Sequence, residues 1–229
     1  AMLGSGQLKH LYYGRKLHAN EAVMTEKHTF IPGNTNVYNK DYSSYSLEDV
    51  CLEMSSLGKG DIRETFIEVT YPNGSSTTDM VFDRAEIIQG KEEYDTLPGS
   101  YDDNGEVEQL VIYLKDRNYN LTLELHYYVY EKCDIITRSA KLVNSGNESV
   151  RLERLMSMQL DLNESDYELS FFNGAWAREM NRSRIPIRAG KYVNESVTGT
   201  SSNRANPFFM IGRSSTTEDY GECYGFNLI

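Results

Sequence analysis

Residues 120–130 read Asn120-Leu121-Thr122-Leu123-Glu124-Leu125-His126-Tyr127-Tyr128-Val129-Tyr130. Apolar side chains recur at every second position, at Leu121, Leu123, Leu125, Tyr127 and Val129. Successive side chains of a β-strand point to opposite faces, whereas helical spacing would scatter these five around a cylinder. The stretch therefore predicts a long strand with one apolar face and one more polar face.

The same alternation recurs along most of the chain. It predicts strands at 64–71, 78–88, 107–114, 134–144, 150–162, 181–193, 208–211 and 222–229, and a short strand at 8–17. Asn73-Gly74 supplies a hairpin turn between the first two. A helical turn is expected at 46–50, but no convincing amphipathic helix. Roughly a dozen strands predict an all-β fold, a large antiparallel β-sandwich that occupies residues 1–229 as one domain with long loops.

Composition limits the class of partner. The chain of 229 residues carries a net charge of −11, so nucleic acid and anionic membrane surfaces, both negatively charged, would repel it. No apolar run approaches the roughly 20 residues that a membrane-spanning helix needs. Cys51, Cys133 and Cys223 are an odd number and widely spaced, which favours a reducing, cytoplasmic compartment over a disulfide framework.

The sequence contains none of the common motifs for catalysis, cofactor binding or metal binding. It contains no phosphate-binding glycine loop, no metal-ligand spacing and no nucleophile elbow, so we expect no cofactor, no metal site and no catalytic residue. His126 lies on a strand, where a packed or solvated histidine is commoner than a ligand. The doublets at 92–93 and 102–103 are interpreted as solvated turns. An acid pair for glycoside hydrolysis could be assembled only by folding.

The single tryptophan is the one candidate for binding. Trp176 lies within Gly174-Ala175-Trp176-Ala177-Arg178-Glu179, where small residues let the backbone come close to whatever the ring covers. Its flat apolar ring with an N–H at the edge suits the face of a sugar, but a lone tryptophan is also a common core residue. Arg178 and Glu179 could orient this loop or form a surface ion pair, which we favour slightly. The long segment 18–46 has no period and is interpreted as a functional or disordered loop.

Six stretches resemble, in order, the N-terminal domain of family 36 glycoside hydrolases, the bacterial α-galactosidases. They are Leu11-Tyr12-Tyr13-Gly14-Arg15-Lys16-Leu17, Gly58-Lys59-Gly60-Asp61-Ile62-Arg63, Leu97-Pro98-Gly99-Ser100-Tyr101, residues 130–140, Gly174-Ala175-Trp176-Ala177-Arg178-Glu179, and Asn206-Pro207-Phe208. The resemblance implies a β-supersandwich, followed after residue 229 by a (β/α)8 barrel that carries both catalytic aspartates. The parent enzyme would be a retaining α-galactosidase, and this chain alone would lack its catalytic carboxylates.

The resemblance also implies partners. In that family a homotetramer places the sandwich of one subunit over the barrel pocket of its neighbour, so Trp176 would lie near the bound galactose. The expected substrates are galactoside oligosaccharides of the raffinose or melibiose type. A second contact, expected on the loop around 26–30, has no secure match. Two alternatives stay open: a free-standing carbohydrate-binding module, and a structural sandwich with Trp176 in its core.

Overall fold

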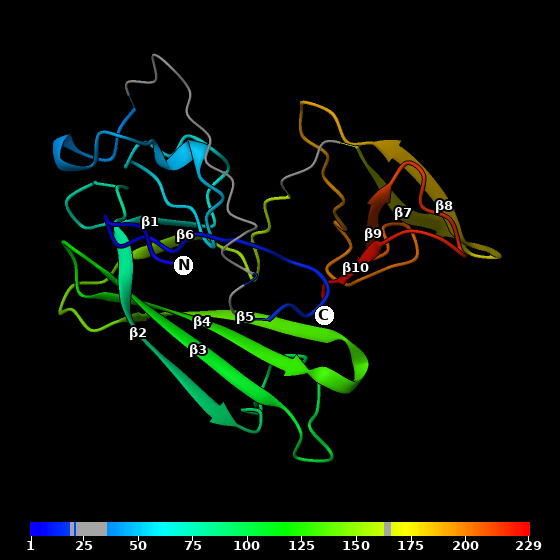
Figure 1. Cartoon of the computed structure of the whole chain (residues 1–229). Coiled ribbons are helices and arrows are strands. Elements are labelled where there is room, and N and C mark those ends of the chain that lie inside the picture. Colours follow the sequence, from blue (N-terminus) through cyan, green and yellow to red (C-terminus); the bar gives the residue numbers. More distant parts are fainter. Residues whose placement is uncertain (19–20, 22–35, 163–165) are drawn as a thin grey trace. The chain divides into compact units, whose positions relative to one another are not determined.

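The computed structural model describes residues 1–18, 21, 36–162 and 166–229 (Figure 1). The chain divides into two compact units, Ala1–Asp161 and Leu162–Ile229. In the described ranges helix is limited to short 3₁₀ turns, and the strands form three antiparallel sheets. The predicted all-β, antiparallel sandwich fold is confirmed.

The first unit is built on a four-stranded sheet. Its strands are β2 (Met80–Gln89), β3 (Glu108–Asp116), β4 (Leu121–Tyr130) and β5 (Ile135–Asn144), paired in that order. These are the four segments predicted at 78–88, 107–114, 120–130 and 134–144, with ends shifted by two residues at most. The register places Leu123 of β4 between Leu114 and Leu142, so the alternation of each strand builds one continuous apolar face.

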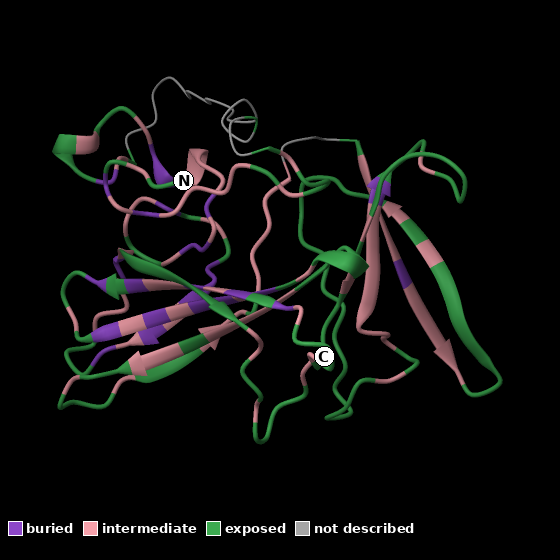
Figure 2. Cartoon of the chain, turned by 60° about the horizontal axis from the view of Figure 1, so that its bottom comes forward, coloured by how far each residue is buried: buried purple, intermediate pink, exposed green. Residues whose placement is uncertain are grey.

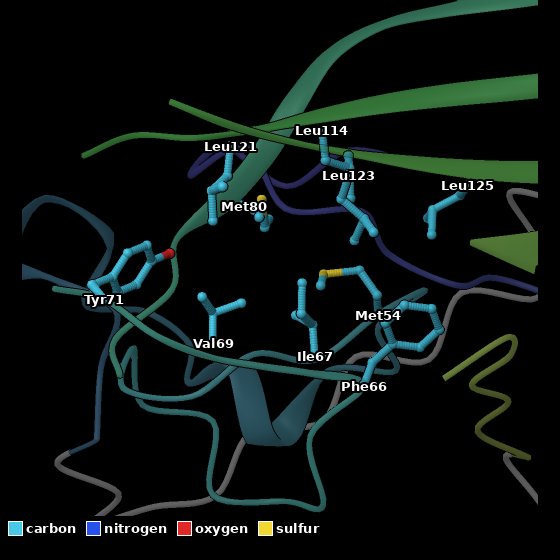
Figure 3. Close-up of a cluster of buried hydrophobic side chains, with 10 residues drawn as sticks. All are labelled: Met54, Phe66, Ile67, Val69, Tyr71, Met80, Leu114, Leu121, Leu123 and Leu125. Atoms are coloured by element: carbon cyan, nitrogen blue, oxygen red, sulfur yellow. The ribbon is translucent and has the colours of Figure 1, made fainter. Parts of the chain in front are cut away.

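A second, smaller layer covers that face. β1 (Ile67–Thr70) pairs with β6 (Arg151–Leu155), and side chains of the two layers interdigitate (Figure 3). The cluster comprises Met54, Phe66, Ile67, Val69, Tyr71, Met80, Leu114, Leu121, Leu123 and Leu125. Burying each large apolar side chain contributes about 1.5–3 kcal/mol, so this cluster is the main source of stability in the unit.

Two features of the first unit differ from the sequence prediction. The predicted strand at 150–162 ends at Leu155, because Gln159 and Asp161 accept backbone N–H groups of Ser55 and Leu52 through their side chains and leave the ladder. The predicted strand at 8–17 is wrong, since that segment makes only isolated bridges at Leu8 and Lys9. The predicted turn of helix at 46–50 is confirmed as a 3₁₀ turn, η3 (Leu47–Asp49). The described part of the chain has two further 3₁₀ turns, η2 (Lys40–Tyr42) and η4 (Glu131–Cys133).

The second unit is a single four-stranded sheet. β7 (Tyr167–Ala175), β8 (Arg178–Pro186), β9 (Phe208–Arg213) and β10 (Cys223–Asn227) are ordered β10-β9-β7-β8. The strand predicted at 181–193 stops at Pro186, and no strand was predicted at β7. Within this unit's described residues only Phe171 and Gly212 are buried, so Figure 2 shows almost no purple on these strands.

Candidate functional site

Trp176 and Ala177 form the two-residue turn between β7 and β8. Ala175 pairs with Arg178 across the turn, and the register shifts between Asn173 and Ala175, which marks a β-bulge. Ala177 has a φ of 61° and Met180 one of 56°, both in the left-handed region that non-glycine residues seldom adopt. A β-bulge increases the local twist of a hairpin, so this bulge changes the direction in which the turn points.

Gly174 permits the bulge. A Cβ at this position would lie 2.8 Å from both the Arg178 carbonyl oxygen and the Glu179 Cα, closer than side-chain carbons come to backbone atoms. Only glycine therefore lets the two strands approach here. The small residues that precede the tryptophan in the sequence serve the close packing of β7 on β8.

Trp176 projects from the turn into solvent. Its exposed fraction is 90%, so the ring is not part of the core of this chain. The hairpin behind it is ordered by side-chain hydrogen bonds: Ala177 N donates to Glu179 Oε1 at 2.9 Å, and Asn181 Nδ2 donates to the Arg178 carbonyl oxygen at 2.8 Å. The favoured ion pair between Arg178 and Glu179 is absent from the structure, where Glu179 closes the turn instead.

Asn206 contacts both strands of the hairpin. Its backbone N–H donates to the Phe172 carbonyl oxygen at 3.1 Å, and its Nδ2 lies 3.5 Å from the sulfur of Met180. Its Oδ1 accepts a hydrogen bond from the N–H of Phe208 at 2.9 Å. The ring centroids of Phe208 and Phe172 lie 6.0 Å apart. Asn206-Pro207-Phe208 is one of the six stretches that resemble family 36, and no role was predicted for it. An Asn-Pro pair before a predicted strand is the one feature of the sequence that marks this contact.

The other sequence candidates that the structure describes have structural surroundings. His126 is 6% exposed and bonded within its own sheet, which confirms the packed interpretation. No group of three or more His, Cys, Asp or Glu that could hold a metal occurs among the residues that the structure describes. Asp102 is not a purely solvated residue, because its carboxylate accepts the N–H groups of Glu106 and Val107. The loop position expected at 26–30 lies outside the described residues.

The structure also bears on disulfides and membrane-spanning helices. Cys51, Cys133 and Cys223 form no disulfide with one another. Among the described residues, no helix is long and apolar enough to cross a membrane.

Known proteins resemble the chain over nearly its full length. The sequence model of the "Glycosyl hydrolase family 36 N-terminal domain" matches residues 6–229. Alpha-galactosidase AgaA of Geobacillus stearothermophilus is 35% identical over 231 residues, which cover 98% of this chain and 31% of AgaA. The bifunctional alpha-galactosidase/sucrose kinase AgaSK of Mediterraneibacter gnavus is 34% identical over 96% of this chain and 24% of that protein.

Solved structures agree with the sequence matches. The alpha-galactosidase from Lactobacillus brevis superposes with a TM-score of 0.91 and 33% identity, over 99% of this chain and 31% of that one. A variant of AgaA in complex with raffinose superposes equally well, with a TM-score of 0.91, 32% identity and coverage of 98% and 31%. This chain thus spans less than a third of each relative. It belongs to glycoside hydrolase family 36, whose N-terminal domain it represents.

Proposed function

We propose that this chain is the non-catalytic N-terminal domain of an α-galactosidase that hydrolyses terminal α-galactosides of the raffinose or melibiose type. Its two units together would form one supersandwich domain, and a catalytic (β/α)8 barrel would follow residue 229. The relatives bear the name alpha-galactosidase, and this chain spans 31% of AgaA. That an AgaA variant binds raffinose supports the choice of substrate.

The observation that carries the proposed role is the exposure of Trp176. The indole at the tip of the hydrogen-bonded hairpin is 90% exposed, so most of its apolar surface contacts water. Burial of this surface against a partner or a sugar would be favourable. We propose that it covers the galactose pocket of a neighbouring subunit in a cytoplasmic homotetramer. The ring would then exclude water from the sugar and contribute to substrate affinity.

The test uses the longest open reading frame that contains residues 1–229. Trp176→Ala should raise KM for raffinose several-fold, because a stacked ring contributes binding energy. Tyr220→Ala is the matched control: it is another exposed aromatic of the second unit, 76% exposed, on the loop before β10. Unchanged KM in Trp176→Ala would refute the role of the ring.

A mixing experiment asks which subunit supplies the ring. Subunits with Trp176→Ala and an intact barrel are refolded with subunits that keep Trp176 but lack the barrel nucleophile. If the tryptophan serves a neighbour, the mixed oligomers contain complete sites and show lower KM than the Trp176→Ala protein alone. No gain on mixing would place the ring over its own barrel.

The free-standing binding module makes a different prediction. The 229-residue chain alone would then bind galactose saturably in calorimetry, and Trp176→Ala would abolish the heat. The proposed domain predicts instead that wild type and Trp176→Ala give the same heat, and that the isolated chain does not hydrolyse nitrophenyl galactoside, because the remainder of the pocket comes from the barrel.

A further inference from the structure

A cleft of about 520 Å³ lies on the four-stranded sheet of the first unit, on the face turned away from the hydrophobic core. Its floor is Val111 of β3 and His126 of β4, which are direct cross-strand neighbours. Glu124 and Lys141, neighbours across β4 and β5, form one side. The volume falls in the range of small-molecule sites. Sequence alternation predicted a polar face here, but not a hollow.

The connection from β2 to β3 lines the other side of the cleft through Gly90, Lys91 and Glu92. Tyr94 of this connection hydrogen-bonds Ser139 and also Tyr128, whose side chain is 1% exposed. The ammonium of Lys91 lies 4.9 Å from the centre of the Tyr94 ring and 4.8 Å from that of Tyr128. Cation–π contacts and buried hydroxyl pairs hold this wall in place, so the cleft is shaped before any ligand arrives.

A buried polar chain runs along the floor. Gln109, only 4% exposed, places its Nε2 2.9 Å from Nδ1 of His126, and Nε2 of His126 lies 3.3 Å from Oε2 of Glu124. Because the Gln109 amide nitrogen can only donate, His126 carries its proton on Nε2 and donates it to Glu124. The ring N–H of His126 and one of the two Gln109 amide hydrogens are therefore already committed within this chain.

Two acceptors in the same chain are left over. Oε1 of Gln109 and Oε1 of Glu124 accept no hydrogen bond from the residues that the structure describes, and neither is sealed from the cleft. Polar atoms withdrawn into a concave surface ordinarily find partners. Two acceptors that line the same cleft therefore favour a ligand that brings several O–H donors.

The charge of the lining decides what kind of ligand fits. Lys91 and Lys141 are balanced by Glu92 and Glu124, so the site neither attracts a strong anion nor a strong cation. Val111 and the ring of Tyr113 add apolar surface beside the polar groups. Hydroxyl groups that both donate and accept, on a framework with CH faces, match this mixture.

We propose that the cleft is a binding site for a neutral saccharide. Hydroxyl groups of the ligand donate to the free oxygens of Glu124 and Gln109, and the ammonium of Lys141 donates to a ligand oxygen. The site belongs wholly to the first unit and contains no residue of the Trp176 hairpin. The proposal does not rest on the role proposed for Trp176.

The experiment uses the 229-residue chain carrying Trp176→Ala, so that binding at the hairpin cannot be mistaken for binding in the cleft. The probe is raffinose, which presents galactosyl, glucosyl and fructosyl rings to the site. The readout is the imidazole NMR signal of His126, assigned with a His126→Gln variant. Saturable movement of this signal, with the other three histidine signals unmoved, is the expected result.

Two variants and a matched control locate the contacts. Glu124→Gln should raise the dissociation constant roughly tenfold, because it replaces a charge-assisted hydrogen bond by a neutral one. Lys141→Ala should also weaken binding, whereas Lys115→Ala should not. Both lysines are exposed and each pairs with one carboxylate, Lys141 with Glu124 at 3.5 Å and Lys115 with Asp83 at 3.0 Å, but only Lys141 lines the cleft.

Three results would overturn the proposal. The His126 signal could fail to move up to the solubility limit of raffinose. The signal could move at the same raffinose concentrations with and without Glu124→Gln, which would show that Glu124 does not contact the ligand. It could respond to inorganic phosphate and not to raffinose, which would show an anion site built on the two lysines. Each result leaves the Trp176 proposal untouched.

Discussion

Arg138 and Glu53 form an ion pair inside the first unit, with 2.8 Å between Arg138 Nη2 and Glu53 Oε1 and exposed side-chain fractions of only 10% and 14%. Tyr127 donates to the same Glu53 oxygen at 2.6 Å, and Nδ1 of His10 lies 3.0 Å from the other. Burial alone would raise the pKa of Glu53, but the hydrogen bond with His10, the charge of Arg138 and the hydroxyl of Tyr127 outweigh it and lower that pKa to about 2. The carboxylate therefore joins the N-terminal segment to two neighbouring strands.

Replacing this carboxylate should destabilise the first unit. Glu53→Gln leaves the Arg138 guanidinium without its counter-ion in a poorly solvated position, which we expect to cost about 3 kcal/mol in the free energy of unfolding. Urea denaturation at pH 7 measures it. Glu86→Gln, which removes the exposed partner of Arg84, is the control and should leave the midpoint unchanged. Equal midpoints for the two variants would contradict the assignment.

The same group predicts the acid stability of the chain. The folded pKa of Glu53 lies below its ordinary value of 4.5, so its contribution is fully present above pH 4.5 and is lost as the pH falls toward about 2. Wild type should lose stability across that window, and Glu53→Gln should lose less. Denaturation series from pH 6 down to about 2 compare the slopes. Parallel curves would show that other carboxylates dominate.

Trp176 should report a solvent-exposed environment by fluorescence. It is the only tryptophan, so all indole emission comes from the hairpin tip. Emission of the 229-residue chain should be red-shifted and readily quenched by acrylamide. Trp176→Ala should change the free energy of unfolding by less than about 0.5 kcal/mol, as expected of a surface side chain. Blue-shifted emission that resists quenching would mean that the ring is covered.

Gly174 should be intolerant of any side chain. In Gly174→Ala the new methyl group would meet backbone atoms of β8 at 2.8 Å, which must shift, so we expect a loss of about 1–3 kcal/mol and altered Trp176 emission. Gly99→Ala is the control, because its Cβ would lie 3.5 Å from the flexible end of Lys91. Native-like emission and stability in Gly174→Ala would show that the bulge can relax.

The second unit should open more readily than the first. Only Phe171 and Gly212 are buried among its described residues, whereas β4 alone buries Leu121, Leu123 and Leu125. Local stability follows buried apolar contacts, so backbone amides of β7–β10 should exchange with deuterium faster than those of β3 and β4. Mass spectrometry of peptic fragments resolves the two. Equal protection would mean that the second sheet is stabilised by contacts beyond its own strands.

Alternation predicted the long strands well, because a period of two survives wherever one face is buried. β4 is the clearest case: Leu121, Leu123 and Leu125 belong to the core and Tyr127 packs against it, whereas only Val129, at the end of the set, is exposed. Alternation failed at 156–162, where polar side chains bond the backbone of another segment and end the ladder. Those partners lie about a hundred residues earlier in the chain, and no local pattern reports them.

The candidate sites were predictable to different degrees. Trp176 was found from its small neighbours, but its exposure depends on a two-residue turn and a bulge that the sequence does not specify. The cleft was missed because Glu124 and His126 resembled an ordinary solvated strand face. Only the fold of the 90–107 connection, which brings Tyr94 onto Tyr128, encloses them.

The length of the β7–β8 hairpin determines how far Trp176 projects from the sheet. Each strand residue advances the tip by about 3.4 Å, so removing one cross-strand pair from both strands would shorten the reach of the indole and turn it to the opposite side. Removing two pairs would withdraw it by about 7 Å while restoring its orientation. Under the role proposed for Trp176, divergence in the length of this hairpin would change how deeply the ring enters the pocket, without altering any residue that touches the sugar.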